Sequence, residues 1–368
     1  MAEFFPRSSH TLLAGFPIPR LLSFASAGLE ISEHSLKHLS FAGRNKLTLQ
    51  SFGNCDLKPD IIAHGEIQDP AALSEDLRTF LPSVGTPYVH VSLPEQKGYV
   101  FRMMIPRDGE LSMKDAVEFR IEENIPLPPS DIIFDCEELA HESTETDRAV
   151  NVTAFPRSTV EMYYAALADA GFVPLSFEIE SQAAARALLP HDDMQARMMV
   201  DFGETRTVIA IAERGVVRFT TSLEVAGNTL AFALRKSGIV DAAEIERLKN
   251  DVGIASQTQG DKTASLLLPT IEQLKDEINR HFVYWRTHGE TSGSLHLPIT
   301  SVVLSGGNAN LKGITEYLSN SMRVPVTLAE VWQNAFTLAD YIPEIPYKQS
   351  LRYATVIGLA LRRGIQNT

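Results

Sequence analysis

Two short stretches of the sequence place an acidic residue at the end of an apolar run and follow it with a tight turn. GLEISEHSLK at residues 28–37 contains Glu30, and MVDFGETRT at residues 199–207 contains Asp201. Such turns expose backbone N–H groups that suit phosphate, and carboxylates can hold a hydrated Mg²⁺. The stretches therefore predict two hairpins that clasp a triphosphate, with Glu30 and Asp201 contacting the metal through water.

Further polar groups in these stretches are suitable hydrogen-bond donors. They are the hydroxyls of Thr205 and Thr207 and the ammonium of Lys37. A third turn, SGGN at residues 305–308, is glycine-rich, although Asn308 is more often a turn former than a ligand contact. Each feature alone is weak evidence, and a single acid more often only caps a turn. Their conjunction, in this order, favours ligand binding.

Each acidic stretch begins a predicted three-strand meander. The first covers residues 27–51 and the second covers residues 197–223. Superposing the two patterns places Glu30 against Asp201 and Ser32 against Gly203. Two meanders with matching spacing predict a duplicated fold.

The segment between the meanders predicts a further unit. Alternating apolar runs and helical patterns give the order β-β-α-β-β-α, which indicates a small α+β module inserted into the first half. Its strands are expected at 88–92, 99–105, 132–139 and 150–155, and its helices at 112–124 and 158–170. Beyond the second meander, helices are expected at 241–253, around 271–285, at 314–321 and at 351–363, with a strand at 299–304.

Composition excludes several classes of function. The chain has 368 residues and a formal charge of −13, with scattered basic residues, so a duplex nucleic-acid surface is not expected. The two cysteines lack metal-ligand spacing and fit a reducing cytoplasm. The histidines, His34 and His281 among them, do not predict a zinc site. Prolines break the apolar runs of residues 1–20, which we expect to form a loose arm, because a membrane span needs about 20 apolar residues.

The order of these motifs resembles the actin-like ATPase superfamily, and within it the PilM family of type IV pilus assembly proteins. The resemblance covers about residues 21–362. It is carried by GLEISEHSLK, VHVSLPEQKGYVFRMMIPR, AVEFRIEENIPLP, MVDFGETRT, LSGGNANLKG and LRYATVIGLALR. It implies an α/β, actin-like (ribonuclease H-like) duplicated fold, with two lobes around a nucleotide cleft and an inserted small α+β subdomain.

The resemblance also implies a division of the chain. The parts are a loose arm (1–20), a first lobe (21–86 and 156–195), an inserted subdomain (87–155), a second lobe (196–350) and a C-terminal connecting helix that returns to the first lobe (351–368).

Site residues follow from the resemblance position by position. The implied binding site for ATP and Mg²⁺ comprises Glu30, Ser32, Glu33, His34, Lys37, Asp201, Gly203, Glu204, Thr205, Thr207, Gly227, Glu246, Lys249, Gly306, Gly307 and Asn308. Glu178 or Glu180, at the start of the first connecting helix, is implied to orient an attacking water. Lys249 is as readily interpreted as a solvated helix lysine as an adenosine contact.

One departure from the superfamily pattern bears on catalysis. The first phosphate loop usually reads D-x-G, whereas this chain has Glu30-Ile31-Ser32. Glutamate reaches further than aspartate, and serine lacks the conformational freedom of glycine. Since orienting a nucleophile tolerates little misplacement, we expect nucleotide binding with slow or absent hydrolysis.

The implied function is that of a cytoplasmic adaptor. Members of the family bind the N-terminal cytoplasmic tail of PilN, here expected in a groove between the inserted module and the first lobe. The chain would then reach the inner face of the cytoplasmic membrane only through its partner, and would link it to other pilus assembly proteins. The sequence leaves open whether it forms homo-oligomers. The alternatives are an FtsA-like cell-division protein and a small-molecule kinase on the same fold.

Overall fold

The computed structural model describes residues 25–43, 46–107, 111–255, 262–291 and 296–362, with only the backbone for 288–291. The arm expected over residues 1–20 lies outside the described residues. No helix in the described ranges is both long and apolar enough to cross a bilayer.

Two five-stranded sheets share one strand order, which confirms the duplicated actin-like fold. Read from the last strand of each meander, the first runs β3-β2-β1-β6-β10 and the second β13-β12-β11-β14-β15. In each sheet an antiparallel meander is extended on one side by two parallel strands. The strands of the first sheet are β1 (Ala27–Ile31), β2 (Ser35–Ala42), β3 (Thr48–Asp56), β6 (Tyr88–Leu93) and β10 (Val173–Ile179). Those of the second are β11 (Ala196–Phe202), β12 (Thr207–Glu213), β13 (Val216–Leu223), β14 (Ile299–Ser305) and β15 (Val326–Leu328).

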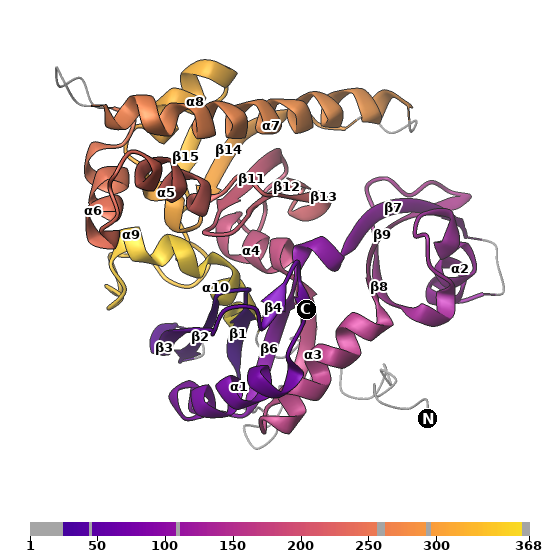
Figure 1. Ribbon diagram of the computed structural model, residues 1–368. Coiled ribbons are helices and arrows are strands. Elements are labelled where there is room, and N and C mark those ends of the chain that lie inside the picture. The colour runs from indigo at the N-terminus through magenta and orange to yellow at the C-terminus, as the bar shows by residue number, and fades with distance from the viewer. Residues whose placement is uncertain (1–24, 44–45, 108–110, 256–261, 292–295, 363–368) are drawn as a thin grey trace.

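Helices cover the outer face of the first sheet. They are α1 (Pro70–Val84) and α3 (Arg157–Asp169), and a two-strand hairpin of β4 (Ile62–Ala63) and β5 (Glu66–Ile67) lies beside them (Figure 1). Leu73 of α1 and Tyr163 of α3 are fully buried in one cluster with Leu29 and Val91 of the sheet. Burial of such side chains, each contributing about 2 kcal/mol, holds this layer together.

The second lobe has its own helical layer. It comprises α5 (Gly227–Lys236), α6 (Ala242–Arg247), α7 (Thr263–Thr291), α8 (Ile314–Met322) and a short 3₁₀ turn, η6 (Gly307–Asn310). The helix expected around 271–285 lies within the long helix α7, whose residues Ile271, Leu274 and Ile278 are fully buried. The helix expected at 241–253 is α6 continued by one π-helical turn, η5 (Leu248–Val252).

The inserted module is a three-stranded sheet of order β7-β9-β8 with one helix on it. Its elements are η2 (Glu95–Lys97), β7 (Tyr99–Pro106), α2 (Met113–Arg120), η3 (Ile121–Glu123), η4 (Pro129–Asp131), β8 (Ile132–Glu138) and β9 (Asp147–Pro156). Ser112 caps α2 as expected, since its hydroxyl accepts from the Asp115 N–H at 3.2 Å.

Two elements assigned to this module by sequence lie elsewhere. The strand expected at 88–92 is β6, which pairs with β1 and β10 in the first sheet. The helix expected at 158–170 is α3, which packs on α1. Sheet membership depends on partners far away in the chain, which the residues of a strand do not indicate.

The module also bonds to the second lobe. Asn151 of β9 donates to the Val217 carbonyl at 3.1 Å, and Arg218 of β13 pairs with Glu142 at 2.8 Å. At the entry to the module, the buried Glu95 accepts hydrogen bonds from Ser181 and Thr220. The module is therefore joined to the first lobe by its chain and to the second lobe by side chains.

Two helices cross between the sheets (Figure 1). They are α4 (Glu180–Leu188) and α10 (Ala354–Leu361), and α10 follows α9 (Tyr347–Ser350) and η7 (Leu351–Tyr353). A methyl group at Gly358 would lie 1.7 Å from the Ala183 carbonyl oxygen, so the two helices are in contact at this point. The helix expected at 351–363 includes α10, and its close approach to α4 requires glycine at position 358.

Candidate functional site

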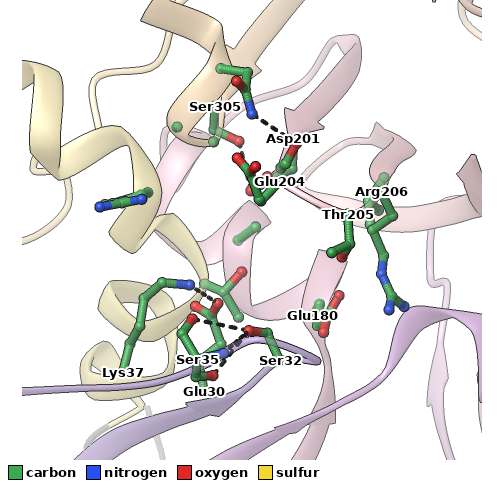
Figure 2. Close-up of a pocket in the computed structure, with 18 of the residues that line it drawn as sticks. Glu30, Ser32, Ser35, Lys37, Glu180, Asp201, Glu204, Thr205, Arg206 and Ser305 are labelled. Carbon is green, nitrogen blue, oxygen red and sulfur yellow. Dashed lines mark hydrogen bonds and ion pairs between the residues drawn. The ribbon is translucent and has the colours of Figure 1, made fainter. Parts of the chain in front are cut away.

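A cavity of about 350 Å³ lies between the two lobes. Glu30 at the end of β1 and Asp201 at the end of β11 both line it, together with Gly306 after β14. Figure 2 shows Glu30 and Lys37 on the first-lobe side, and Asp201 with Ser305 on the other. The two acidic hairpins thus share one hollow, which has a volume typical of a small-molecule site.

The first hairpin is closed by hydroxyl groups. The Ser32 N–H donates to the Ser35 carbonyl at 2.9 Å, and the Ser35 N–H donates to Ser32 Oγ at 3.0 Å. Ser32 does not take a positive φ, so serine causes no backbone strain in the place where the superfamily has glycine. Glu30 pairs with Lys37, which lies opposite it on β2.

The second hairpin is held by polar contacts behind it. The Gly203 N–H donates to the Arg206 carbonyl at 3.0 Å, and the Gly203 carbonyl accepts from Asn308 Nδ2 at 2.9 Å and from the Gly227 N–H at 3.0 Å. Thr207 is buried, and its hydroxyl donates to the Val225 carbonyl at 2.6 Å. Thr207 and Gly227 therefore fix the loop and are not among the lining residues.

Gly306 is required by its surroundings. Its φ is +86°, and a methyl group there would lie 2.6 Å from both Asp201 Oδ1 and the Phe202 carbonyl oxygen. Ser305 Oγ donates to Asp201 Oδ2 at 3.2 Å. The glycine-rich turn thus approaches the second acid closely and orients its carboxylate.

Burial changes the protonation of two carboxyl groups in the cavity. It raises the pKa of Asp201 to about 6, and the negative charge of Glu30 adds to the effect. It also raises the pKa of Glu180 to about 8, although the Arg206 guanidinium opposes this. At neutral pH Glu180 is mostly protonated and Asp201 mostly ionised.

The structure separates the two glutamates proposed to orient water. Glu180 lines the cavity at the start of α4. Glu178 is not a lining residue and instead pairs with Arg186 and Arg362, each at 2.6 Å. Burial alone would raise the pKa of Glu178, but the two guanidinium groups outweigh it and bring the pKa below its usual value. Glu178 therefore anchors the ends of α4 and α10.

The lining of the cavity includes a buried lysine. Lys249 is only 2% exposed, and its ammonium pairs with Glu246 Oε1 at 2.5 Å. It belongs to the π-helical turn, a feature often found at functional sites. The interpretation of Lys249 as a solvated helix lysine is therefore wrong, and its side chain borders the cavity.

Most of the residues expected at the site line this one cavity. They are Glu30, Ser32, Glu33, His34, Lys37, Glu180, Asp201, Gly203, Glu204, Thr205, Glu246, Lys249, Gly306, Gly307 and Asn308. Lining residues that the sequence analysis did not single out include Ser35, Tyr163, Arg206, Asn310, Lys348 and Arg352. Arg206 lies inside a quoted motif, but nothing local indicated its partner, Glu33 of the other lobe.

The donor set can accommodate a magnesium–phosphate group. Within the described ranges, no group of three or more His, Cys, Asp or Glu side chains is arranged to hold a metal ion alone. Mg²⁺ seldom needs one, since it usually keeps several waters and takes one or two carboxylates plus phosphate oxygens. Asp201 and Glu30 could supply those carboxylates.

Comparison with protein families and solved structures places the chain among known folds. Residues 28–364 match the family model described as type IV pilus assembly protein PilM. A search of curated proteins finds no match. A structure titled PilM-PilN type IV pilus biogenesis complex is similar with a TM-score of 0.75 and 21% identity, over 92% of this chain and 98% of that chain.

Two further solved structures share the fold at lower similarity. MreB5 of Spiroplasma citri bound to ADP has a TM-score of 0.52 at 11% identity, over 92% of this chain and 95% of that one. Ethanolamine utilization protein EutJ from Carboxydothermus hydrogenoformans has a TM-score of 0.51 at 16% identity, over 91% and 88%. These likenesses agree with the two-lobed actin-like architecture.

Proposed function

Because the chain belongs to the PilM family of type IV pilus assembly proteins, we propose that it is an ATP-binding adaptor of pilus assembly. In this proposal it binds Mg²⁺ and ATP in the cavity and the N-terminal cytoplasmic tail of a PilN protein elsewhere on its surface. It thereby connects the inner-membrane assembly complex to cytoplasmic components, and reaches the membrane through that partner.

The observation that carries nucleotide binding is the position of Glu30 and Asp201. They come from equivalent strands of two duplicated lobes and line the same cavity. Two structures that share the fold, both of MreB5 of Spiroplasma citri and titled as bound to ADP and to AMPPNP, support this part of the proposal. Bound Mg²⁺ would neutralise phosphate charge. Lys37, Thr205 and the backbone N–H groups of the two hairpins would contact the phosphates.

Slow or absent hydrolysis is part of the proposal. Glu180 is the acid placed to orient a water, and with a pKa of about 8 it is mostly protonated at neutral pH. A protonated carboxyl cannot accept a proton from an attacking water. Glu30 is also held by Lys37 within its own hairpin. Both features favour binding over turnover.

The partner is suggested by the solved relative titled PilM-PilN type IV pilus biogenesis complex. An extended peptide can bind in a groove through backbone hydrogen bonds and side-chain pockets. We propose that the tail binds between the inserted module and the first lobe. Glu95 bonds to Ser181 beside the cavity, so nucleotide occupancy could reach this region through a direct contact.

Calorimetric titration with MgATP tests nucleotide binding. We expect saturable binding that Asp201→Asn weakens at least tenfold. The matched control is Asp169→Asn, which removes a carboxylate from an exposed ion pair with Arg78 outside the cavity. Absence of binding by the natural chain would refute the nucleotide part of the proposal.

A pull-down with a synthetic PilN tail peptide, with and without ATP, tests the adaptor role. We expect capture by the full chain and a change in affinity when MgATP is present. A peptide of the same composition in scrambled order is the control. No capture in either condition would remove the adaptor function and leave nucleotide binding standing.

A further inference from the structure

An ion pair crosses the cavity between the two hairpins. Arg206, in the turn after β11, pairs through its guanidinium with Glu33 Oε1 in the turn after β1. The two side chains are 16% and 15% exposed, and both line the cavity. Figure 2 shows Arg206 extending from the second lobe toward the first-lobe chain, beside Glu180.

This pair differs from the other ion pairs of the cavity. Lys37 and Glu30 belong to one hairpin, and Lys249 and Glu246 are three residues apart on one helix. Those cations stay paired even when the two lobes move relative to each other, because both members of each pair belong to one lobe. Arg206 keeps its partner only while the tips of the two hairpins stay together.

The position of Arg206 matches one part of a nucleotide. Under the proposed function we place the adenosine toward Glu246 and Lys249 and the phosphates between the hairpins, all of which line the cavity. The phosphate farthest from the adenosine then lies toward the hairpin tips, where Arg206 and Glu33 meet. A guanidinium forms bidentate hydrogen bonds with phosphate as well as with carboxylate, so a terminal phosphate competes with Glu33.

We propose that Arg206 determines specificity for nucleoside triphosphates over diphosphates. Glu33 holds the guanidinium in the nucleotide-free chain, and the terminal phosphate takes it over when a triphosphate binds. This inference rests on the proposed function of the cavity. A diphosphate ends short of the hairpin tips and leaves the pair intact, so its binding does not depend on Arg206.

The test compares ATP and ADP, each with Mg²⁺, by calorimetric titration of the full chain. Arg206→Gln should lower the affinity for ATP about tenfold to a hundredfold and change the affinity for ADP less than threefold. Glu33→Gln removes the competing carboxylate and should raise the affinity for ATP about threefold or more. Arg206→Lys should restore part of the loss, since it keeps the charge without the bidentate geometry.

The matched control is Arg107→Gln, which removes an arginine from an ion pair with Glu138 outside the cavity and should change neither affinity. Thermal unfolding of each variant shows whether it is folded. Equal losses for ATP and ADP in Arg206→Gln, or no loss for either, would overturn the role of Arg206 alone. A natural chain that binds neither nucleotide would instead overturn the proposed function, and this inference with it.

Discussion

Asp201 and Glu30 are brought to one cavity by equivalent strands of two lobes, and the charge of Glu30 raises the cost of ionising Asp201. The charge of Glu30 contributes to the elevated pKa of Asp201, while Lys37 opposes it. A pair of like charges close together is unfavourable without a cation between them. The ionised form of Asp201 is therefore destabilised by the neighbouring charge of Glu30, and a bound Mg²⁺ would offset this repulsion.

The first prediction concerns Asp201 and pH. Because its pKa is about 6, the carboxyl must lose a proton before it can serve a metal at lower pH. We expect affinity for MgATP to fall as pH drops below about 6, by up to tenfold per pH unit. Asp201→Asn should remove this part of the pH dependence. Titrations at several pH values between 5 and 8 measure it, and identical profiles for the two proteins would contradict the assignment.

The second prediction concerns Glu180 and the stability of the ligand-free chain. Its folded-state pKa lies above the unfolded value, so the folded state keeps a proton that the unfolded state loses. Stability should therefore fall as pH rises from about 4.5 to about 8, in total by about 4 kcal/mol. Glu180→Gln should flatten this slope in urea unfolding experiments.

Glu178→Gln should change the stability of the chain in the opposite direction to Glu180→Gln. The arginines lower the pKa of Glu178, so its contribution is present at neutral pH and is lost as pH falls through that lowered value. This variant should be less stable than the natural chain at pH 7, whereas Glu180→Gln should be at least as stable. The same direction of change in both variants would refute the distinction drawn between these neighbouring acids.

The third prediction concerns Gly306. Gly306→Ala places a methyl group 2.6 Å from Asp201 Oδ1 and adds backbone strain at a positive φ. We expect a loss of about 2–4 kcal/mol in unfolding free energy, together with loss of measurable MgATP binding. Gly238→Ala is a matched control, since its φ is +98° but nothing lies within 4 Å of the added methyl group. It should cost about 1–2 kcal/mol and leave nucleotide affinity intact.

The fourth prediction concerns the attachment of the inserted module. Arg218 is 3% exposed and pairs with Glu142, which also accepts from Arg102 at 2.6 Å. Arg218→Gln should destabilise the chain by about 2–4 kcal/mol, because the mostly buried carboxylate of Glu142 then loses one of its two arginine partners. Hydrogen exchange should quicken in β9 and β13 and stay unchanged in β1. Uniform exchange across all three strands would argue against a local attachment.

Much of this architecture was predictable from local pattern. The meanders of β1–β3 and β11–β13 follow from alternating apolar residues and turn formers, and the end of α2 follows from the proline-rich segment after Asn124. The assignment of β6 was wrong because its partners, β1 and β10, are distant in sequence. A strand's own residues do not identify the sheet in which it is buried.

The candidate site was predictable to a similar degree. Residues adjacent to an acid at a strand end, such as Ser32 and Gly203, could be placed from their spacing. The pairing of Arg206 with Glu33 could not, because it depends on how two lobes meet. The roles of Glu178 and Glu180 also differ for a nonlocal reason, since Arg186 and Arg362 neutralise Glu178, and Arg362 lies far away in the chain, after α10.

The contact between Gly358 and the Ala183 carbonyl has a mechanical consequence. Backbones that touch leave little space for sliding, so we expect any relative motion of the lobes to be a rotation about that crossing point. In a rotation, the displacement of an atom grows with its distance from the axis. Small rotations about the crossing point would therefore produce larger displacements at the outer edge of each lobe, where a bound tail could respond to them.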